Sequence, residues 1–141
     1  MKDTPKYILL SVILSLVFSV SAGAASDSQI KKVTPEINDE GVQKVEIIGG
    51  SHFFDPNYII VKVDVPVELE FTKESGMVPH DVAMHSPEAG IDFKFDISST
   101  PESVSFTPTK VGKYPFYCTK KLLFFESHKD KGMEGILEVR E

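Results

Sequence analysis

The sequence predicts an all-β domain, a sandwich or barrel of about seven or eight short strands. Three observations support this prediction. Apolar and polar residues alternate over short runs such as Val67–Phe71 and Ile91–Ile97, as is typical of a strand with one buried face. Turn residues separate these runs at intervals of roughly 8–12 residues. Most prolines and glycines lie between the runs, where they interrupt no hydrogen-bond ladder.

The expected strands follow one another from residue 42 to the end of the chain. The first ends at a Gly49-Gly50 pair, the second is rich in β-branched residues, and the third alternates cleanly. The expected strands are Val42–Ile48, Tyr58–Val63, Val67–Phe71, Val78–Met84, Ile91–Ile97, Ser103–Phe106, Tyr114–Cys118 and Gly135–Arg140. Pro79 and Pro115 fall within this pattern, and they indicate edge positions or irregular strand starts.

Residues 1–24 have the form of a secretory signal peptide. A basic start precedes the apolar run Tyr7–Val20, and an A-x-A site follows at Ala22–Ala24. The apolar run is shorter than the roughly 20 residues that a spanning helix needs. We therefore expect cleavage after Ala24 and a periplasmic or otherwise exported protein, with an uncleaved membrane anchor as the alternative. Residues 25–41 are polar and predict a flexible lead-in to a single domain, 42–141.

Charge and cysteine content narrow the classes of function. The net charge of −6 argues against nucleic acids and anionic lipid surfaces as partners. The single cysteine, Cys118, forms no internal disulfide, so in an exported protein it indicates intermolecular pairing, a reactive role, metal ligation or simple burial. The sequence shows no acid–base pair, Ser/His/Asp set or phosphate-binding loop, so we expect no enzyme.

Thiolate, imidazole and thioether side chains gather near the C-terminus, where Cys118, His128 and Met133 follow one another. A soft thiolate and thioether with imidazole suit copper, especially Cu(I), better than magnesium or calcium. A second strand could supply a further ligand, and His80 in M-V-P-H-D-V-A-M is the candidate. Two His, one Cys and a weak axial Met make the electron-transfer copper site.

The other two histidines are expected to lie away from this site. His85 is five positions after His80, so on a regular strand it faces the opposite way. His52 lies beside a glycine pair, and we expect it at the surface.

Four segments of the chain carry a resemblance to a known family, and they are Phe54–Val63, Met77–Val82, Ser105–Cys118 and Gly132–Val139. Over Val42–Glu141 the chain resembles the cupredoxins, the blue copper proteins related to plastocyanin and azurin. The resemblance implies a Greek-key β-sandwich that holds one copper ion, which cycles between Cu(I) and Cu(II). It implies that the ligands are His80, Cys118, His128 and Met133.

The segment between the cysteine and the second histidine departs from the family pattern. Nine residues, Thr119–Ser127, lie there, where family members usually have only a few. Glu126 competes as a ligand, because the red-copper protein nitrosocyanin has a carboxylate in place of the axial Met. A binuclear site like that of cytochrome oxidase is excluded, because Leu122 stands where its second cysteine would fall. Lys120–Lys131 is the only stretch with a weak helical pattern.

The resemblance implies a single-electron carrier whose redox partner is a cytochrome or an oxidase. A copper chaperone or tolerance protein and a nitrosocyanin-like red-copper protein are the alternatives. We expect the Thr119–Ser127 insert to be a docking surface, because it holds four consecutive apolar residues between lysines. Inward packing of Leu122 and Phe125 is the other possibility. A membrane is a partner only if the N-terminal segment is uncleaved.

Overall fold

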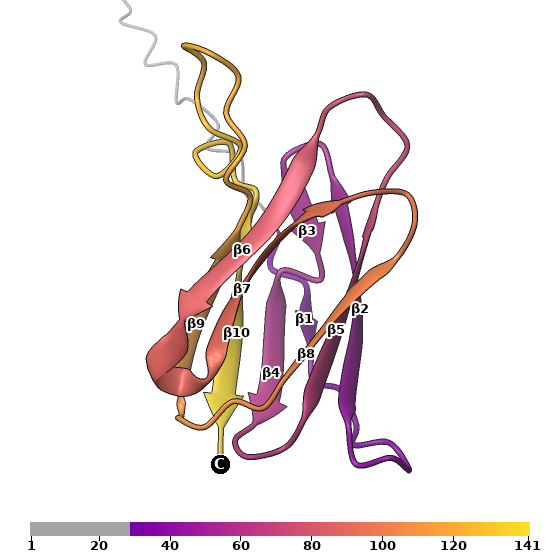
Figure 1. The fold of residues 1–141 in the computed structure, drawn as a ribbon, viewed down its shortest axis with the longest axis vertical. Coiled ribbons are helices and arrows are strands. Elements are labelled where there is room, and N and C mark those ends of the chain that lie inside the picture. The colour runs from indigo at the N-terminus through magenta and orange to yellow at the C-terminus, as the bar shows by residue number, and fades with distance from the viewer. Residues whose placement is uncertain (1–28) are drawn as a thin grey trace, which may run out of the picture.

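The computed structural model describes residues 29–141, and its regular elements are strands apart from one short 3-10 turn (Figure 1). The strands are β1 (Lys32–Val33), β2 (Gln43–Gly50), β3 (Phe53–Asp55), β4 (Tyr58–Lys62), β5 (Val67–Lys73), β6 (His80–Ser86), β7 (Ile91–Ile97), β8 (Glu102–Phe106), β9 (Gly112–Tyr117) and β10 (Glu134–Arg140); the 3-10 turn is η1 (Pro87–Ala89). Within these residues no helix is long and apolar enough to cross a membrane. The predicted signal peptide lies outside the described residues.

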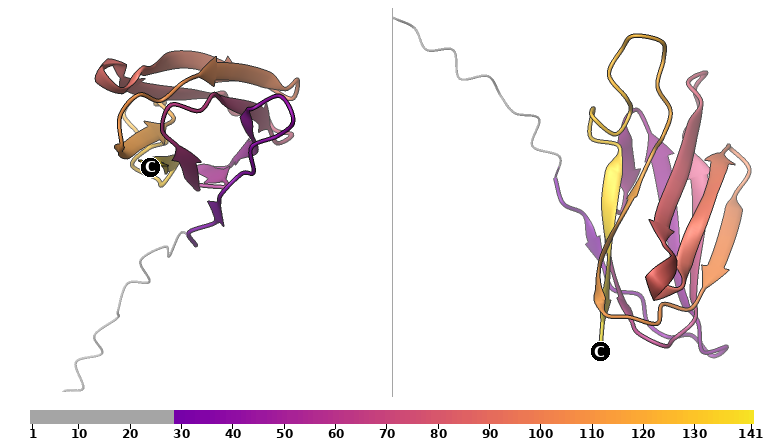
Figure 2. Two further views of the ribbon diagram at one scale, coloured as in Figure 1. Left: turned by 90° about the horizontal axis from the view of Figure 1, so that it is seen from below. Right: turned by 60° about the vertical axis from the view of Figure 1, so that its left-hand side comes forward.

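The strands form two sheets that pack face to face, so the prediction of an all-β sandwich is confirmed. The six-stranded sheet has the order β1-β4-β10-β9-β6-β7, and the four-stranded sheet has the order β3-β2-β5-β8. The two layers are visible when the molecule is viewed along its strands (Figure 2, left). All eight expected strands are present. The two additional strands, β1 and β3, have only two and three residues, too few for alternation to reveal them.

The core forms where the predicted alternation places apolar side chains between the sheets. In β5, Val67, Leu69 and Phe71 are fully buried, whereas Glu68 and Glu70 face outward. The Phe71 ring packs edge-on against Phe54, from β3 of the same sheet, and against Phe116, from β9 of the other sheet. The alternating pattern therefore identified both the strand and its buried face.

The strand arrangement brings the candidate ligands to one end of the sandwich. Strands β6 and β9 run antiparallel and pair through Ala83 and Tyr117. His80 begins β6 and Cys118 directly follows β9, so both residues lie near this pairing. The connections β5–β6 and β9–β10 project from the same end, and the C-terminus lies at the other (Figure 1).

Both unusual prolines occupy places where a missing N–H does little harm. Pro79 directly precedes the first residue of β6, as an irregular strand start would require. Pro115 lies inside β9, but the only β6 residue that pairs with β9 is Ala83, opposite Tyr117. That edge of β9 therefore demands few donors, and a proline is tolerated there.

The segment with the weak helical pattern, Lys120–Lys131, forms turns instead of a helix. Lys121 and Ser127 form an isolated antiparallel bridge across it. Its backbone is thus held by this bridge and by turn bonds, with a single i to i−4 bond from the Lys131 N–H to the Ser127 carbonyl.

The described part of the expected lead-in is attached to the sheet. β1 pairs in parallel with β4, and the Lys31 N–H donates to the Asn57 side-chain oxygen at 2.8 Å. The boundaries after residues 24 and 41 stay predictions.

Gly135 should tolerate no side chain, because a Cβ there would lie 2.3 Å from Phe116 Cζ and 2.7 Å from the Asn57 carbonyl oxygen. We expect Gly135→Ala to lower the free energy of unfolding by about 1–3 kcal/mol, the usual cost of overpacking. Urea unfolding followed by circular dichroism measures the change. Gly76→Ala is the matched control, since its Cβ would meet nothing within 4 Å. Equal stability of the two variants would contradict the prediction.

Candidate metal centre

Backbone hydrogen bonds close the segment 118–133 on itself. The Cys118 N–H donates to the Met133 carbonyl at 3.0 Å, and the Met133 N–H donates to the His128 carbonyl at 2.9 Å. The His128 N–H in turn donates to the Lys120 carbonyl at 3.0 Å. The long insert therefore leaves and returns through a closed base, and His128 comes back beside Cys118 despite the nine intervening residues.

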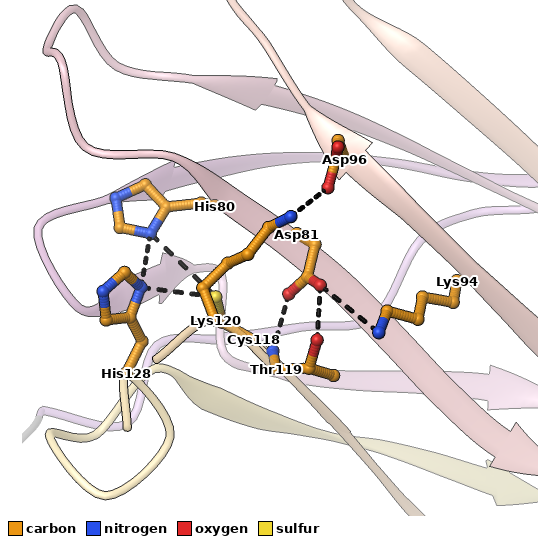
Figure 3. Close-up of polar contacts among 8 residues, drawn as sticks. All are labelled: His80, Asp81, Lys94, Asp96, Cys118, Thr119, Lys120 and His128. Carbon is orange, nitrogen blue, oxygen red and sulfur yellow. Dashed lines mark hydrogen bonds and ion pairs between the residues drawn. The ribbon is translucent and has the colours of Figure 1, made fainter. Parts of the chain in front are cut away.

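Three donor side chains meet at this base. His80 Nδ1 lies 3.1 Å from His128 Nδ1, and Cys118 Sγ lies 3.5 Å from His128 Nδ1 and 4.0 Å from His80 Nδ1 (Figure 3). All three residues are buried. Donors that bind one ion at the usual lengths of about 2.0–2.3 Å are themselves about 3–4 Å apart. The spacing therefore fits a single metal ion, and this is the one such cluster found among residues 29–141.

Met133 is fully buried next to this cluster. It follows Gly132, whose φ of +100° a residue with a side chain rarely adopts. The Met133 methyl carbon packs against the bare backbone of Gly49, where a Cβ would lie 3.4 Å from it. Together with the backbone bonds to Cys118 and His128, this packing fixes Met133 beside the three donors.

His52 lies beside the cluster, where the sequence had indicated only a surface position. Its ring is half-buried and packs edge-on against the His128 ring, with centroids 4.8 Å apart, and lies 6.3 Å from the His80 ring. The cause is tertiary: β2 runs parallel to β5, so residues after β2 end near the loop that leads to His80. No spacing in the sequence signals this approach.

His85 lies away from the cluster, as its spacing predicted. It is exposed and pairs with Asp92 at 2.8 Å, which raises the pKa of His85 through that hydrogen bond. Glu126 is also exposed on the insert and does not belong to the three-donor cluster.

Burial keeps all three donors uncharged when no metal is bound. Desolvation, followed by repulsion from His128, lowers the pKa of His80 to about 4. Desolvation also lowers the pKa of His128 and raises the pKa of the Cys118 thiol. Two neutral imidazoles are ready to bind a metal, whereas the thiol must release its proton. The donor set of thiolate, imidazole and thioether fits copper.

The insert exposes its apolar residues to solvent, so inward packing of Leu122 and Phe125 is wrong. Together with the neighbouring loop they form one surface, which we call the apolar loop face: Met77, Val78, Leu122, Leu123, Phe124 and Phe125. Phe124 and Met77 are each 100% exposed. A hollow of about 280 Å³ between the two loops reaches His128. Apolar side chains, together with Lys120 and Lys121, therefore line the approach to the donor cluster.

The sequence matches no protein-family model and no curated protein, but the fold matches solved structures. The metal-binding domain of the Cu(I)-exporting P-type ATPase CopA of Streptococcus pneumoniae, solved with Cu(I), is similar with a TM-score of 0.59 and 20% identity, covering 80% of this chain and 99% of that one. Reduced auracyanin from Roseiflexus castenholzii is similar with a TM-score of 0.55 and 18% identity, and the match covers 70% of this chain and 97% of auracyanin. The periplasmic domain of cytochrome oxidase subunit II of Bradyrhizobium japonicum is similar with a TM-score of 0.53 and 16% identity, and the match covers 70% of this chain and 83% of that domain.

These likenesses show the fold of the chain. The chain has the same two-sheet β-sandwich fold as these proteins, and this is the fold that the sequence resemblance to the cupredoxins implied.

The metal-free protein should lose stability as the pH falls from about 6.5 to about 4. The folded-state pKa of His80 is lowered to about 4, so in this window the unfolded chain binds a proton that the folded chain excludes. Thermal unfolding at a series of pH values measures the loss. His80→Gln should flatten this part of the profile, whereas His85→Gln should not, because the pKa of His85 is shifted in the opposite direction. Parallel profiles for wild type and His80→Gln would refute this origin of the pH dependence.

Proposed function

We propose that the protein is a mononuclear copper protein that carries single electrons. The observation that supports this most directly is the buried cluster of His80, Cys118 and His128, whose donor atoms lie within 4.8 Å of one another. A copper ion bound there would supply a one-electron couple between Cu(I) and Cu(II). Cys118 would hold it as thiolate, His80 and His128 as neutral imidazoles, and Met133 as a weak axial thioether.

The surroundings suit a site that changes its charge without changing its shape. His80 is fixed at the start of β6. The other donors lie on the segment 118–133, which we call the ligand loop, and the backbone bonds that close this loop fix them. Little rearrangement should therefore accompany gain or loss of an electron. The His128 ring lines the surface hollow, and the His52 ring packs against it and restricts its movement.

Two other copper functions are kept as alternatives. Similarity to the CopA metal-binding domain, solved with Cu(I), supports a copper chaperone or tolerance protein. A nitrosocyanin-like red-copper site would require Glu126 as a ligand, and its exposure on the insert favours Met133 instead. The colour of the copper-loaded protein distinguishes the three.

The N-terminal pattern supports export, so the periplasm or an equivalent space is the proposed location. The proposed partner is a redox protein, a cytochrome or an oxidase. The cytochrome oxidase subunit among the similar structures supports a place in electron transport, without naming the partner.

Loaded with Cu(II), the protein should show a strong visible thiolate-to-copper charge-transfer band. Cys118→Ser should abolish the band, because Cys118 is the only thiol in the sequence. Absorption spectroscopy measures the band, and circular dichroism of the metal-free variant checks that the sandwich is intact. A colourless Cu(I)-binding protein would favour the chaperone, and an unchanged band in Cys118→Ser would refute the site.

Titration with Cu(II), followed by the same absorption band, tests the remaining ligands. His80→Ala and His128→Ala should each weaken copper binding, whereas His85→Ala, which removes an exposed imidazole, is the matched control. Met133→Leu should chiefly shift the reduction potential, since a long axial ligand tunes the metal more than it holds it. A larger spectral change in Glu126→Gln than in Met133→Leu would favour the red-copper alternative.

The apolar loop face is the proposed docking surface for the redox partner. Four of its residues, Met77, Val78, Leu122 and Phe125, line hollows that His128 also lines, and electron transfer requires the partner close to the metal edge. Transient redox encounters use small interfaces, which a patch of this kind could form. The exposed lysines beside it, Lys121, Lys129 and Lys131, favour a partner with acidic groups around its own apolar contact.

Replacing Leu123 and Phe124 together with Ser should slow electron exchange between Cu(I) and Cu(II) copies of the protein. We expect a slowing of at least about tenfold, equivalent to about 1.4 kcal/mol of lost apolar contact. Nuclear magnetic resonance line broadening measures the rate. Reduction by a small ruthenium complex, the colour and the melting temperature should stay unchanged. Val111→Ser, an exposed residue just before β9 at the other end, is the control. Loss of stability in the double variant would instead assign the loop to the core.

A further inference from the structure

A buried carboxylate lies directly behind the donor cluster. Asp81 follows His80 in β6 and is only 1% exposed. One of its oxygens accepts the backbone N–H of Thr119 at 2.6 Å, and the other accepts the Thr119 hydroxyl (Figure 3). The Asp81 carboxylate therefore connects the strand that begins at His80 to the segment that carries Cys118.

This link lies where the backbone alone connects the two strands poorly. The only ladder pair between β6 and β9 joins Ala83 and Tyr117. Beyond that pair, the bonds from Asp81 to Thr119 hold the start of β6 against the chain that carries Cys118. Asp81 thus sets the separation of His80 and Cys118 without touching a metal itself.

Positioning alone does not require a charge. An amide oxygen in the place of one carboxylate oxygen would accept the Thr119 N–H equally well. A carboxylate in addition brings a full negative charge into a buried place, which is costly unless that charge is paired. Asp81 forms one ion pair among the described residues, with Lys94, whose Nζ lies 3.7 Å away and whose side chain is 60% exposed. The compensation by Lys94 is therefore partial.

A second cation, Lys120, acts on Asp81 through its charge but pairs at close range with another carboxylate. Lys120 Nζ lies 2.6 Å from the exposed carboxylate of Asp96 (Figure 3). The field of Asp81 consequently acts on the donor cluster through protein, where screening by water and salt is weak. A negative charge in that position interacts more strongly with a doubly charged ion than with a singly charged one.

We propose that Asp81 is a positioning residue whose buried negative charge biases the site toward Cu(II) over Cu(I), and toward divalent ions in general. The inference rests on the proposed copper site. It assigns a preference between oxidation states to a residue that is not a ligand.

The test compares two carboxylate-to-amide variants, Asp81→Asn and Asp96→Asn. Asp81→Asn should keep the charge-transfer band and move the Cu(II)/Cu(I) equilibrium toward Cu(I) by about tenfold, the effect of one charge at reduced dielectric. Asp96→Asn removes the same charge from the surface, where it is 76% exposed, and should produce only a small shift. Redox titration against dyes measures both. Equal shifts, or no shift in Asp81→Asn, would overturn the proposal.

Cobalt binding provides a readout that is independent of electron transfer. Asp81→Asn should weaken Co(II) binding by about tenfold relative to Asp96→Asn, because the ion is divalent. Unchanged Co(II) affinity would count against the proposal whether or not the protein carries electrons. A wild-type protein without the charge-transfer band would instead refute the proposed function.

Lys94→Gln and Thr119→Val separate charge from structure. Lys94→Gln removes the exposed partial counter-charge and should shift the equilibrium in the opposite direction, toward Cu(II). If Asp81→Asn does not fold, Lys94→Gln still tests the effect of the buried charge. An absent shift in Lys94→Gln, or a shift toward Cu(I), would contradict the proposal. Thr119→Val removes the hydroxyl bond but keeps the charge, so it should lower the melting temperature while the equilibrium shifts far less than in Asp81→Asn.

Discussion

The hydrogen bonds that close the ligand loop are the interactions on which the candidate site depends. The bonds Cys118 to Met133, Met133 to His128 and His128 to Lys120 set the backbone path of three proposed ligands. They also separate the insert from the site mechanically, since the chain between Lys120 and His128 projects beyond a closed base. The loop can therefore vary in length and composition while the donors keep their positions.

The same closure explains how polar side chains are accommodated at the end of an apolar core. His80 and His128 share a contact between their Nδ1 atoms, in which one ring donates and the other accepts, and Cys118 Sγ lies against both. Among the residues described by the structure, no buried side-chain nitrogen or oxygen lacks a partner. The donors thus satisfy one another without a metal, and burial keeps them neutral. A metal ion would replace these mutual contacts and would displace the thiol proton.

Charge and apolar surface lie on different sides of the cluster. Asp81 and its partner Thr119 lie behind the donors, where protein excludes water. The apolar loop face lies in front, next to the hollow that reaches His128. A buried charge acts strongly on a metal over a short distance, whereas exposed apolar side chains favour contact with another surface. In the proposed electron carrier, separate residues would therefore set the preference between oxidation states and the approach of a partner.

The sequence alone determined the sandwich, most strand positions and the residue types of the site, because these depend on local patterns. Alternation in β5 predicted the burial of Val67, Leu69 and Phe71, and Cys118, His128 and Met133 belong to one short segment. The tertiary structure decided what depends on residues far apart in the chain. It placed His52 beside His128 through the parallel pairing of β2 with β5, buried Asp81 against Thr119, and left Phe124 exposed. Sequence periodicity reports which face of one strand is apolar, but it carries no information about which loops meet at the end of two packed sheets.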